Sequence, residues 1–107
     1  MGLSNEYFRN APDGWSMENT ETIAKADGIS MSDDHWQLIN ALQEYYSKVE
    51  HPNLRQVKDA LNEKFHVQGG IKFLHRLVPS GPIAGGCKLA GLEVPAGAID
   101  KSFGSVA

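Results

Sequence analysis

The chemistry that this sequence allows centres on one thiol. Cys87 is the only cysteine in the chain of 107 residues, and it lies between the pair Gly85-Gly86 and Lys88. Neighbouring glycines leave a thiol sterically open and let a partner's backbone approach. An adjacent ammonium group favours the thiolate. This pattern indicates thiol–disulfide or persulfide exchange. The alternative is an inert cysteine packed beneath the C-terminal tail, and the spacing of the residues leaves both interpretations open.

Other kinds of site are not indicated. A single cysteine excludes an intramolecular disulfide and leaves no second thiolate for a metal. The four histidines lie on different predicted elements, so we expect no metal site. Residues 81–91 are rich in glycine but lack the preceding strand and the Gly-Lys-Ser/Thr ending of a phosphate-binding loop. We therefore expect no cofactor, and we expect a carrier or partner protein rather than a stand-alone enzyme.

Charge is unevenly distributed along the chain. Residues 1–47 contain eight acidic and two basic residues, whereas residues 48–88 contain seven basic and three acidic ones. The net charge of -3 gives no global basic field for nucleic acid. Such a division often reflects two solvated faces, but it also suits an anionic partner on the basic half. The candidate partner-binding residues are Arg55, Lys58, Lys64, Lys72, Arg76 and Lys88.

Length and composition predict one soluble domain. A chain of 107 residues can bury a modest core. No apolar run approaches the 18 or so residues of a membrane span, and the first ten residues lack the pattern of a secretory signal. We therefore expect no membrane contact and a cytoplasmic location.

The thiol would be positioned by a mainly α-helical body. Ser16, Ser32 and Asn53 are suited to cap helices, and Pro82 is suited to the first position of another. In the second helix Trp36 and Ile39 begin an apolar stripe with the three- and four-residue spacing of one buried face. The break at Pro52 gives a helix-turn-helix-like arrangement. The predicted helices are 19–26, about 33–49, 54–65, 71–78 and 83–90.

The organisation that follows has three parts. We predict an irregular N-terminal segment at 1–14, a helical domain at 15–91 and a flexible C-terminal arm at 92–107. The glycines at 85 and 86 each weaken the last helix by roughly 1 kcal/mol relative to alanine. Cys87 is therefore expected near the start of the arm.

Several short motifs resemble one known family. They are Gly28-Ile29, His35-Trp36, Tyr45-Tyr46, Pro52 with Arg55, Leu74 with Arg76-Leu77, Pro79-Ser80-Gly81-Pro82, Ala90-Gly91-Leu92, Pro95 and Gly97. In this order and spacing they resemble the DsrC/TusE family, which comprises the gamma protein of dissimilatory sulfite reductase and its relatives in the sulfur relay for tRNA thiolation. The resemblance covers roughly residues 27–99. It implies a small helical fold with a helix-turn-helix-like element and a flexible C-terminal arm.

The resemblance also implies roles for positions in the arm. Family members ordinarily carry sulfur on a penultimate cysteine, and the sulfite reductase partners have a second cysteine eleven residues earlier. Cys87 matches the earlier position, whereas Ala98 stands where the sulfur carrier would be, and the chain runs eight residues past Ile99. Other departures are Gln43 for an arginine, His75 for a tyrosine, Ser80 for a frequent lysine, and the lack of most of the expected N-terminal hairpin.

Three functions follow from this interpretation. In the first, a sulfur-trafficking protein of the DsrC/TusE type uses Cys87 as its only persulfide or mixed-disulfide site and exchanges sulfur with a sulfur-relay or sulfite-reductase-type partner. In the second, a non-catalytic regulatory or assembly protein binds a partner protein, or DNA, through its basic helical face. In the third, a structural subunit docks its tail into a larger enzyme. An exposed thiol would favour the first, and a buried thiol would favour regulation or assembly.

Overall fold

The structure is a computed structural model that describes residues 8–79 and 81–95. This part of the chain contains α-helices and one short 3-10 turn, His66–Gln68, and no strand. The predicted mainly helical fold is therefore confirmed. The α-helices are α1 (Met17–Ala26), α2 (Asp33–Lys48), α3 (Leu54–Lys64), α4 (Ile71–Leu77) and α5 (Pro82–Ala90).

The helices begin where the sequence contains capping residues. The Ser16 hydroxyl accepts a hydrogen bond from the Asn19 amide at 3.1 Å. Asn53 accepts from the Gln56 amide and donates its own amide to the Gln56 side chain, both at 2.9 Å. These bonds satisfy amides that have no partner inside the helix. The predicted capping residues Ser16 and Asn53 are therefore confirmed, although α1 begins two residues before the predicted range of 19–26.

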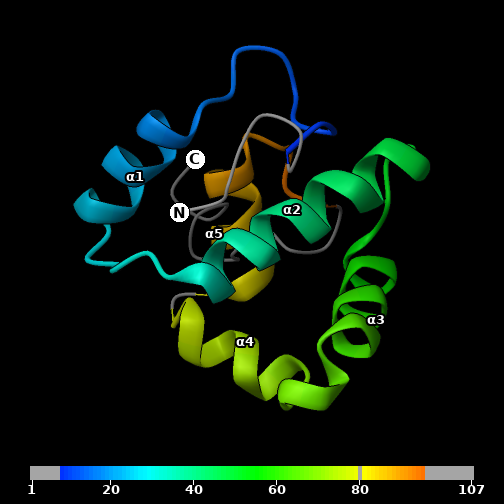
Figure 1. Cartoon of the computed structure of the whole chain (residues 1–107). Helices are drawn as coiled ribbons and strands as arrows, with labels where there is room; N and C mark the ends of the chain where they lie inside the picture. Colours follow the sequence, from blue (N-terminus) through cyan, green and yellow to red (C-terminus); the bar gives the residue numbers. More distant parts are fainter. Residues whose placement is uncertain (1–7, 80, 96–107) are drawn as a thin grey trace, which may run out of the picture.

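Helix α5 lies at the centre of the fold. It contacts each of the other four α-helices, and its most extensive contact is with α2. Figure 1 shows α5 behind α2, with α1, α3 and α4 arranged around this pair. Its buried residues include Ile83, Cys87, Leu89 and Ala90. The helix that carries the thiol is therefore a core element and is not part of a loose tail.

The core is wider than the predicted stripe on α2. Leu38 and Ala41 are buried together with Trp36, Ile39 and Leu42. Several helices pack around α2, so its buried surface spans more than one face. None of the helices in the described ranges is long and apolar enough to cross a membrane.

The core also begins earlier than Trp15, the residue at which we expected the ordered part to start. Phe8 is buried, and its ring lies 4.9 Å from that of Trp15 and 5.7 Å from that of Trp36. These contacts join the N-terminal segment to α2.

Gly86 allows α5 and α2 to approach closely. A Cβ atom at this position would lie 2.7 Å from Leu42 Cδ1 and 3.5 Å from Leu38 Cδ2. Leu42 and Leu38 are themselves buried, so neither can move without disturbing the core. From the sequence, the glycines were expected to let a partner approach Cys87. The structure corrects this for Gly86, whose missing side chain lets α5 pack against α2.

We expect Gly86→Ala to lower the free energy of unfolding by about 1–3 kcal/mol, because the added methyl group overpacks the contact with Leu42. Gly85→Ala is the matched control, since it makes the same change in the same helix at a partly exposed position. Urea unfolding followed by circular dichroism measures both. Equal stabilities of the two variants would contradict the packing role of Gly86.

Candidate functional site

The thiol of Cys87 is enclosed. Its residue has no exposed surface, and it lies in the last turns of α5, on the side that packs into the core. The sequence left open whether this thiol is accessible or packed beneath the tail, and the structure shows it buried. The buried position follows from the close approach of α5 to α2 at the neighbouring Gly86.

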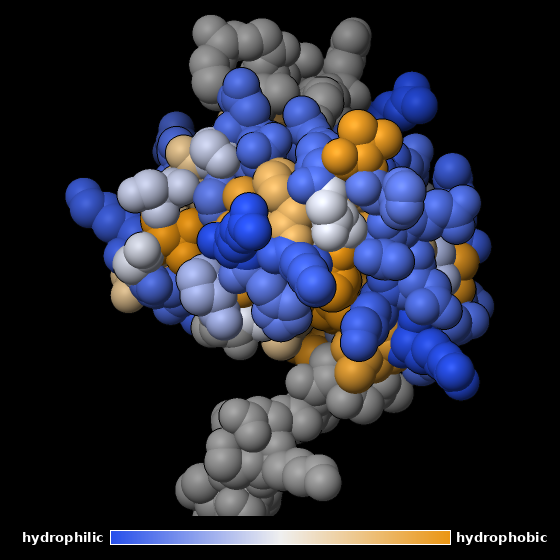
Figure 2. Space-filling view, turned by 90° about the horizontal axis from the view of Figure 1, so that it is seen from below, coloured by the Kyte–Doolittle hydropathy of each residue, from blue (hydrophilic) through white to orange (hydrophobic). Residues whose placement is uncertain are grey.

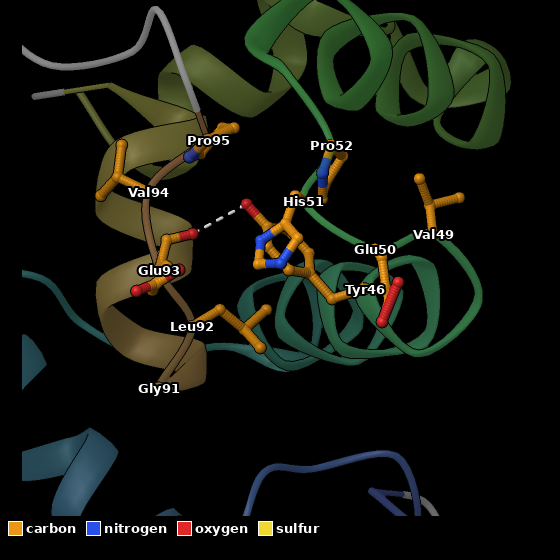
Figure 3. Close-up of a pocket in the computed structure, with 10 residues that line it drawn as sticks. All are labelled: Tyr46, Val49, Glu50, His51, Pro52, Gly91, Leu92, Glu93, Val94 and Pro95. Carbon is orange, nitrogen blue, oxygen red and sulfur yellow. Dashed lines mark hydrogen bonds between the residues drawn. The ribbon is translucent and has the colours of Figure 1, made fainter.

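Tyr46 of α2 is the polar neighbour of this thiol. Its hydroxyl oxygen lies 3.6 Å from Cys87 Sγ, and it donates a hydrogen bond to the carbonyl oxygen of Glu93 at 2.8 Å. Figure 3 shows the second bond as a dashed line between α2 and the chain that follows α5. One hydroxyl thus touches the thiol and the beginning of the predicted arm.

Burial suppresses ionisation of both groups. Desolvation raises the pKa of Cys87 from 9.0 to about 11, and a hydrogen bond from the Tyr46 hydroxyl to the thiolate offsets this only in part. Desolvation, followed by the contact with Cys87, also raises the pKa of Tyr46 above its ordinary value. At neutral pH the site therefore holds a protonated thiol beside a protonated hydroxyl.

Lys88 does not assist the thiol. Its ammonium group lies 3.0 Å from Asp27 Oδ2, at the end of α1. Both side chains are partly exposed, so this pair contributes little to stability. The expectation that Lys88 favours the Cys87 thiolate is wrong, because the raised pKa of the thiol has desolvation as its main cause.

A cavity of about 550 Å³ lies beside Tyr46. One wall is the turn between α2 and α3, from Val49 to Pro52, and the other is formed by residues 91–95 (Figure 3). Tyr46 lines this cavity and also contacts Cys87, which is not among the lining residues. The Tyr46 side chain therefore stands between the cavity and the thiol.

The carboxyl end of α5 is held by side chains from distant parts of the sequence. Trp15 Nε1 and Thr20 Oγ1 both donate to the Leu89 carbonyl at 2.8 Å, and Gln43 Nε2 donates to the Ala90 carbonyl at 3.1 Å. The amide of Leu92 turns back to the Cys87 carbonyl at 2.9 Å. These bonds satisfy carbonyls that a helix end leaves without partners.

Most of this arrangement could not be predicted from the sequence. Tyr46 was considered in the Tyr45-Tyr46 motif, Trp15 as the beginning of the ordered part, and Gln43 only as a departure from the family. Gln43 is buried, and its Oε1 atom has no hydrogen-bond partner among the described residues. No local pattern marks these residues, because their partners lie 41 to 74 positions away.

The candidate partner-binding residues do not form one group. Arg55 and Lys58 are exposed on α3, and Lys72 and Arg76 are exposed on α4. Lys64 is engaged with Glu44 at 3.5 Å, and Lys88 is engaged with Asp27. Figure 2, which views the molecule from below, shows a mainly hydrophilic surface interrupted by apolar residues.

The histidines also differ in environment. His35 is buried, its Nδ1 accepts from the Ser32 amide at 3.2 Å, and its Nε2 donates to the Leu77 carbonyl at 2.7 Å. It therefore links α2 to α4. In residues 8–79 and 81–95, no three His, Cys, Asp or Glu side chains are grouped so that they could hold a metal ion. Ala98 and most of the predicted arm lie outside the described residues.

The raised pKa of Cys87 predicts an unusual pH dependence of thiol alkylation. Only the thiolate reacts, so the rate should rise about tenfold per pH unit and continue to rise beyond pH 9, towards 11. Iodoacetamide labelling followed by intact mass measures the rate. A rate that levels off near pH 9 would show an ordinary thiol.

Comparison with known proteins shows which family and which relatives this chain is similar to. The family model described as DsrC like protein matches residues 2–99, so the match begins earlier than the residues 27–99 of the sequence analysis. The sulfurtransferase TusE of Salmonella choleraesuis is 34% identical over 97 residues, which are 89% of each chain. TusE of Escherichia coli K12 is 34% identical over 83 residues, which are 76% of each chain.

A solved structure agrees with the fold. The NMR structure of DsrC from Allochromatium vinosum superposes with a TM-score of 0.67 at 32% sequence identity, covering 81% of this chain and 80% of that one. With the family match over most of the sequence, this shows that the chain belongs to the DsrC-like protein family.

Proposed function

We propose that this protein is a sulfur-trafficking protein of the DsrC/TusE type, and that Cys87 is the thiol that takes up sulfur. Membership of the family and relatives named sulfurtransferase TusE support the sulfur-relay function. Cys87 is the only cysteine of the chain, so a persulfide or a mixed disulfide has no other site. The assignment of sulfur uptake to Cys87 depends on this observation.

Sulfur uptake requires only an exchange. A donor persulfide R–S–SH transfers its outer sulfur to Cys87, which gives Cys87–S–SH and R–SH. The proton of the Cys87 thiol passes to the departing donor sulfur, and no external oxidant is needed. Because the thiol is enclosed and its pKa is about 11, the chain must open before this exchange. A partner that opens the site would make the protein a carrier rather than a stand-alone enzyme.

After incubation with a persulfide donor, we expect the intact mass of the wild type to increase by one sulfur atom. Cys87→Ala is the control and should gain nothing. Dithiothreitol should restore the original mass, because a persulfide is reducible. A wild-type mass that does not change under any donor concentration would reject Cys87 as the sulfur site.

The burial of Cys87 favours a second candidate, in which the protein is a regulatory or assembly partner that needs no thiol chemistry. Arg55, Lys58, Lys72 and Arg76 are exposed and form no ion pair with any other described residue. They are therefore available to an acidic surface of a partner protein of sulfur metabolism or to DNA. Acidic side chains also lie on α3, at Asp59 and Glu63, which makes a protein partner fit better than a nucleic acid.

For this second candidate, Arg55→Glu with Lys58→Glu should reduce the amount of partner captured from a native cell extract by about tenfold, because both charges are reversed. Arg9→Glu with Lys25→Glu makes the same change in net charge at other exposed positions and is the control. Cys87→Ala should leave capture unchanged. Capture that depends on Cys87 and not on α3 would support the first candidate.

Duplex DNA is tested separately. If DNA were the partner, its affinity would fall steeply with salt concentration, and the double variant on α3 would reduce that dependence. Fluorescence anisotropy with a labelled duplex measures this.

A further inference from the structure

The hydroxyl of Tyr46 has two partners and only one proton. It lies 2.8 Å from the carbonyl oxygen of Glu93 and 3.6 Å from Cys87 Sγ. A carbonyl oxygen cannot donate, so the Tyr46 proton must be directed to Glu93. The thiol proton of Cys87 then points to the Tyr46 oxygen. The order of donors is thus Cys87, Tyr46, Glu93.

This order holds only while Cys87 is a free thiol. A sulfur atom bonded to Cys87 replaces the thiol proton, so Sγ can no longer donate to Tyr46. The added atom also needs room, and the Cys87 residue has no exposed surface. The Tyr46 side chain contacts the thiol and lines the cavity of about 550 Å³. It can therefore make room for the added atom by moving into this cavity.

We propose that Tyr46 is a latch that reports the sulfur state of Cys87. With a free thiol, Tyr46 holds the chain at Glu93 against α2 and keeps the site closed. When Cys87 carries an added sulfur, Tyr46 turns towards the cavity, its bond to Glu93 breaks, and Glu93 and Val94 move away from α2, while Leu92 and Pro95 stay packed. The cavity changes shape in the same event, because residues 91–95 form one of its walls.

The latch acts on two exposed residues that lie between two packed ones. Leu92 packs against the core and Pro95 is buried, whereas Glu93 and Val94 are exposed. Among the described residues, the Tyr46 hydroxyl is the side-chain group bonded to Glu93, and loss of this bond loosens Glu93 and Val94. A partner could therefore distinguish the loaded protein from the empty one by the position of Glu93 and Val94. Tyr46 is a positioning residue in this scheme and forms no bond to the transferred sulfur.

The test uses a small disulfide adduct in place of the persulfide. Methyl methanethiosulfonate converts the Cys87 thiol to Cys87–S–S–CH3 and releases methanesulfinic acid, and dithiothreitol reverses the change. The adduct is formed in urea, the chain is refolded, and intact mass confirms one adduct. The NMR order parameters of the Glu93 and Val94 amides then report whether these two residues are held.

In the free wild type we expect order parameters near 0.85, and in its adduct values below about 0.6. Tyr46→Phe keeps the ring and removes the hydroxyl, so these amides should be mobile both with and without the adduct. Tyr45→Phe is the matched control, because it makes the same change at the next position of α2 and should behave as the wild type. Dithiothreitol should restore the order of the wild type.

Three results would overturn the latch. The first is a wild-type adduct as ordered at Glu93 and Val94 as the free protein. The second is a Tyr46→Phe variant that follows the wild-type pattern. The third is an adduct with which the chain cannot refold, because movement of Tyr46 is expected to provide the room.

The latch rests on the proposed function in one respect, because the proposed sulfur relay is the natural source of the sulfur on Cys87. The methyl disulfide forms without any relay protein, so a working latch with no persulfide uptake would reject the proposed role of Cys87 alone. Persulfide uptake without any response at Glu93 and Val94 would reject the latch alone.

Discussion

The close contact between α5 and α2 is the constraint on which the rest of this structure depends. Gly86 removes the side chain that would otherwise meet Leu42, and the two helices approach until their buried residues interlock. Because α5 also contacts α1, α3 and α4, its position determines where the other helices can pack. The same contact places the next residue, Cys87, in the interior.

The hydrogen bonds at the end of α5 determine the direction in which the chain leaves the helix. Its last carbonyls accept hydrogen bonds from Trp15, Thr20 and Gln43, which come from the N-terminal segment, α1 and α2. Residues 91–93 consequently leave the helix in one direction, past Tyr46. The site combines a thiol that burial keeps protonated with a hydroxyl that bonds the chain at Glu93. Burial protects the thiol from oxidation, and it also requires an opening step before any exchange.

The residues that flank Cys87 in the sequence do not determine the reactivity of its thiol in the fold. From the sequence, a lone cysteine beside glycines and a lysine could be either open and reactive or packed and inert. In the fold, Gly86 serves packing and Lys88 is paired with Asp27, so neither neighbour activates the thiol. Any reactivity of Cys87 must come from a change of conformation or from a partner, which fits a carrier within a relay better than an independent catalyst.

The sequence by itself determined the local elements and the family. Ser16, Asn53, Pro82 and Gly91 mark helix ends through bonds and backbone angles within a few residues, so the helix boundaries could be predicted closely. Motifs such as His35-Trp36 indicated the DsrC/TusE family, which the comparisons confirmed. Only the tertiary structure decided that Cys87 is buried, that Tyr46 stands beside it, and that Lys88 turns away from it to Asp27. The physical reason is that the hydrogen bond of the thiol and the ion pair of Lys88 join groups 41 and 61 residues apart, which no local pattern encodes.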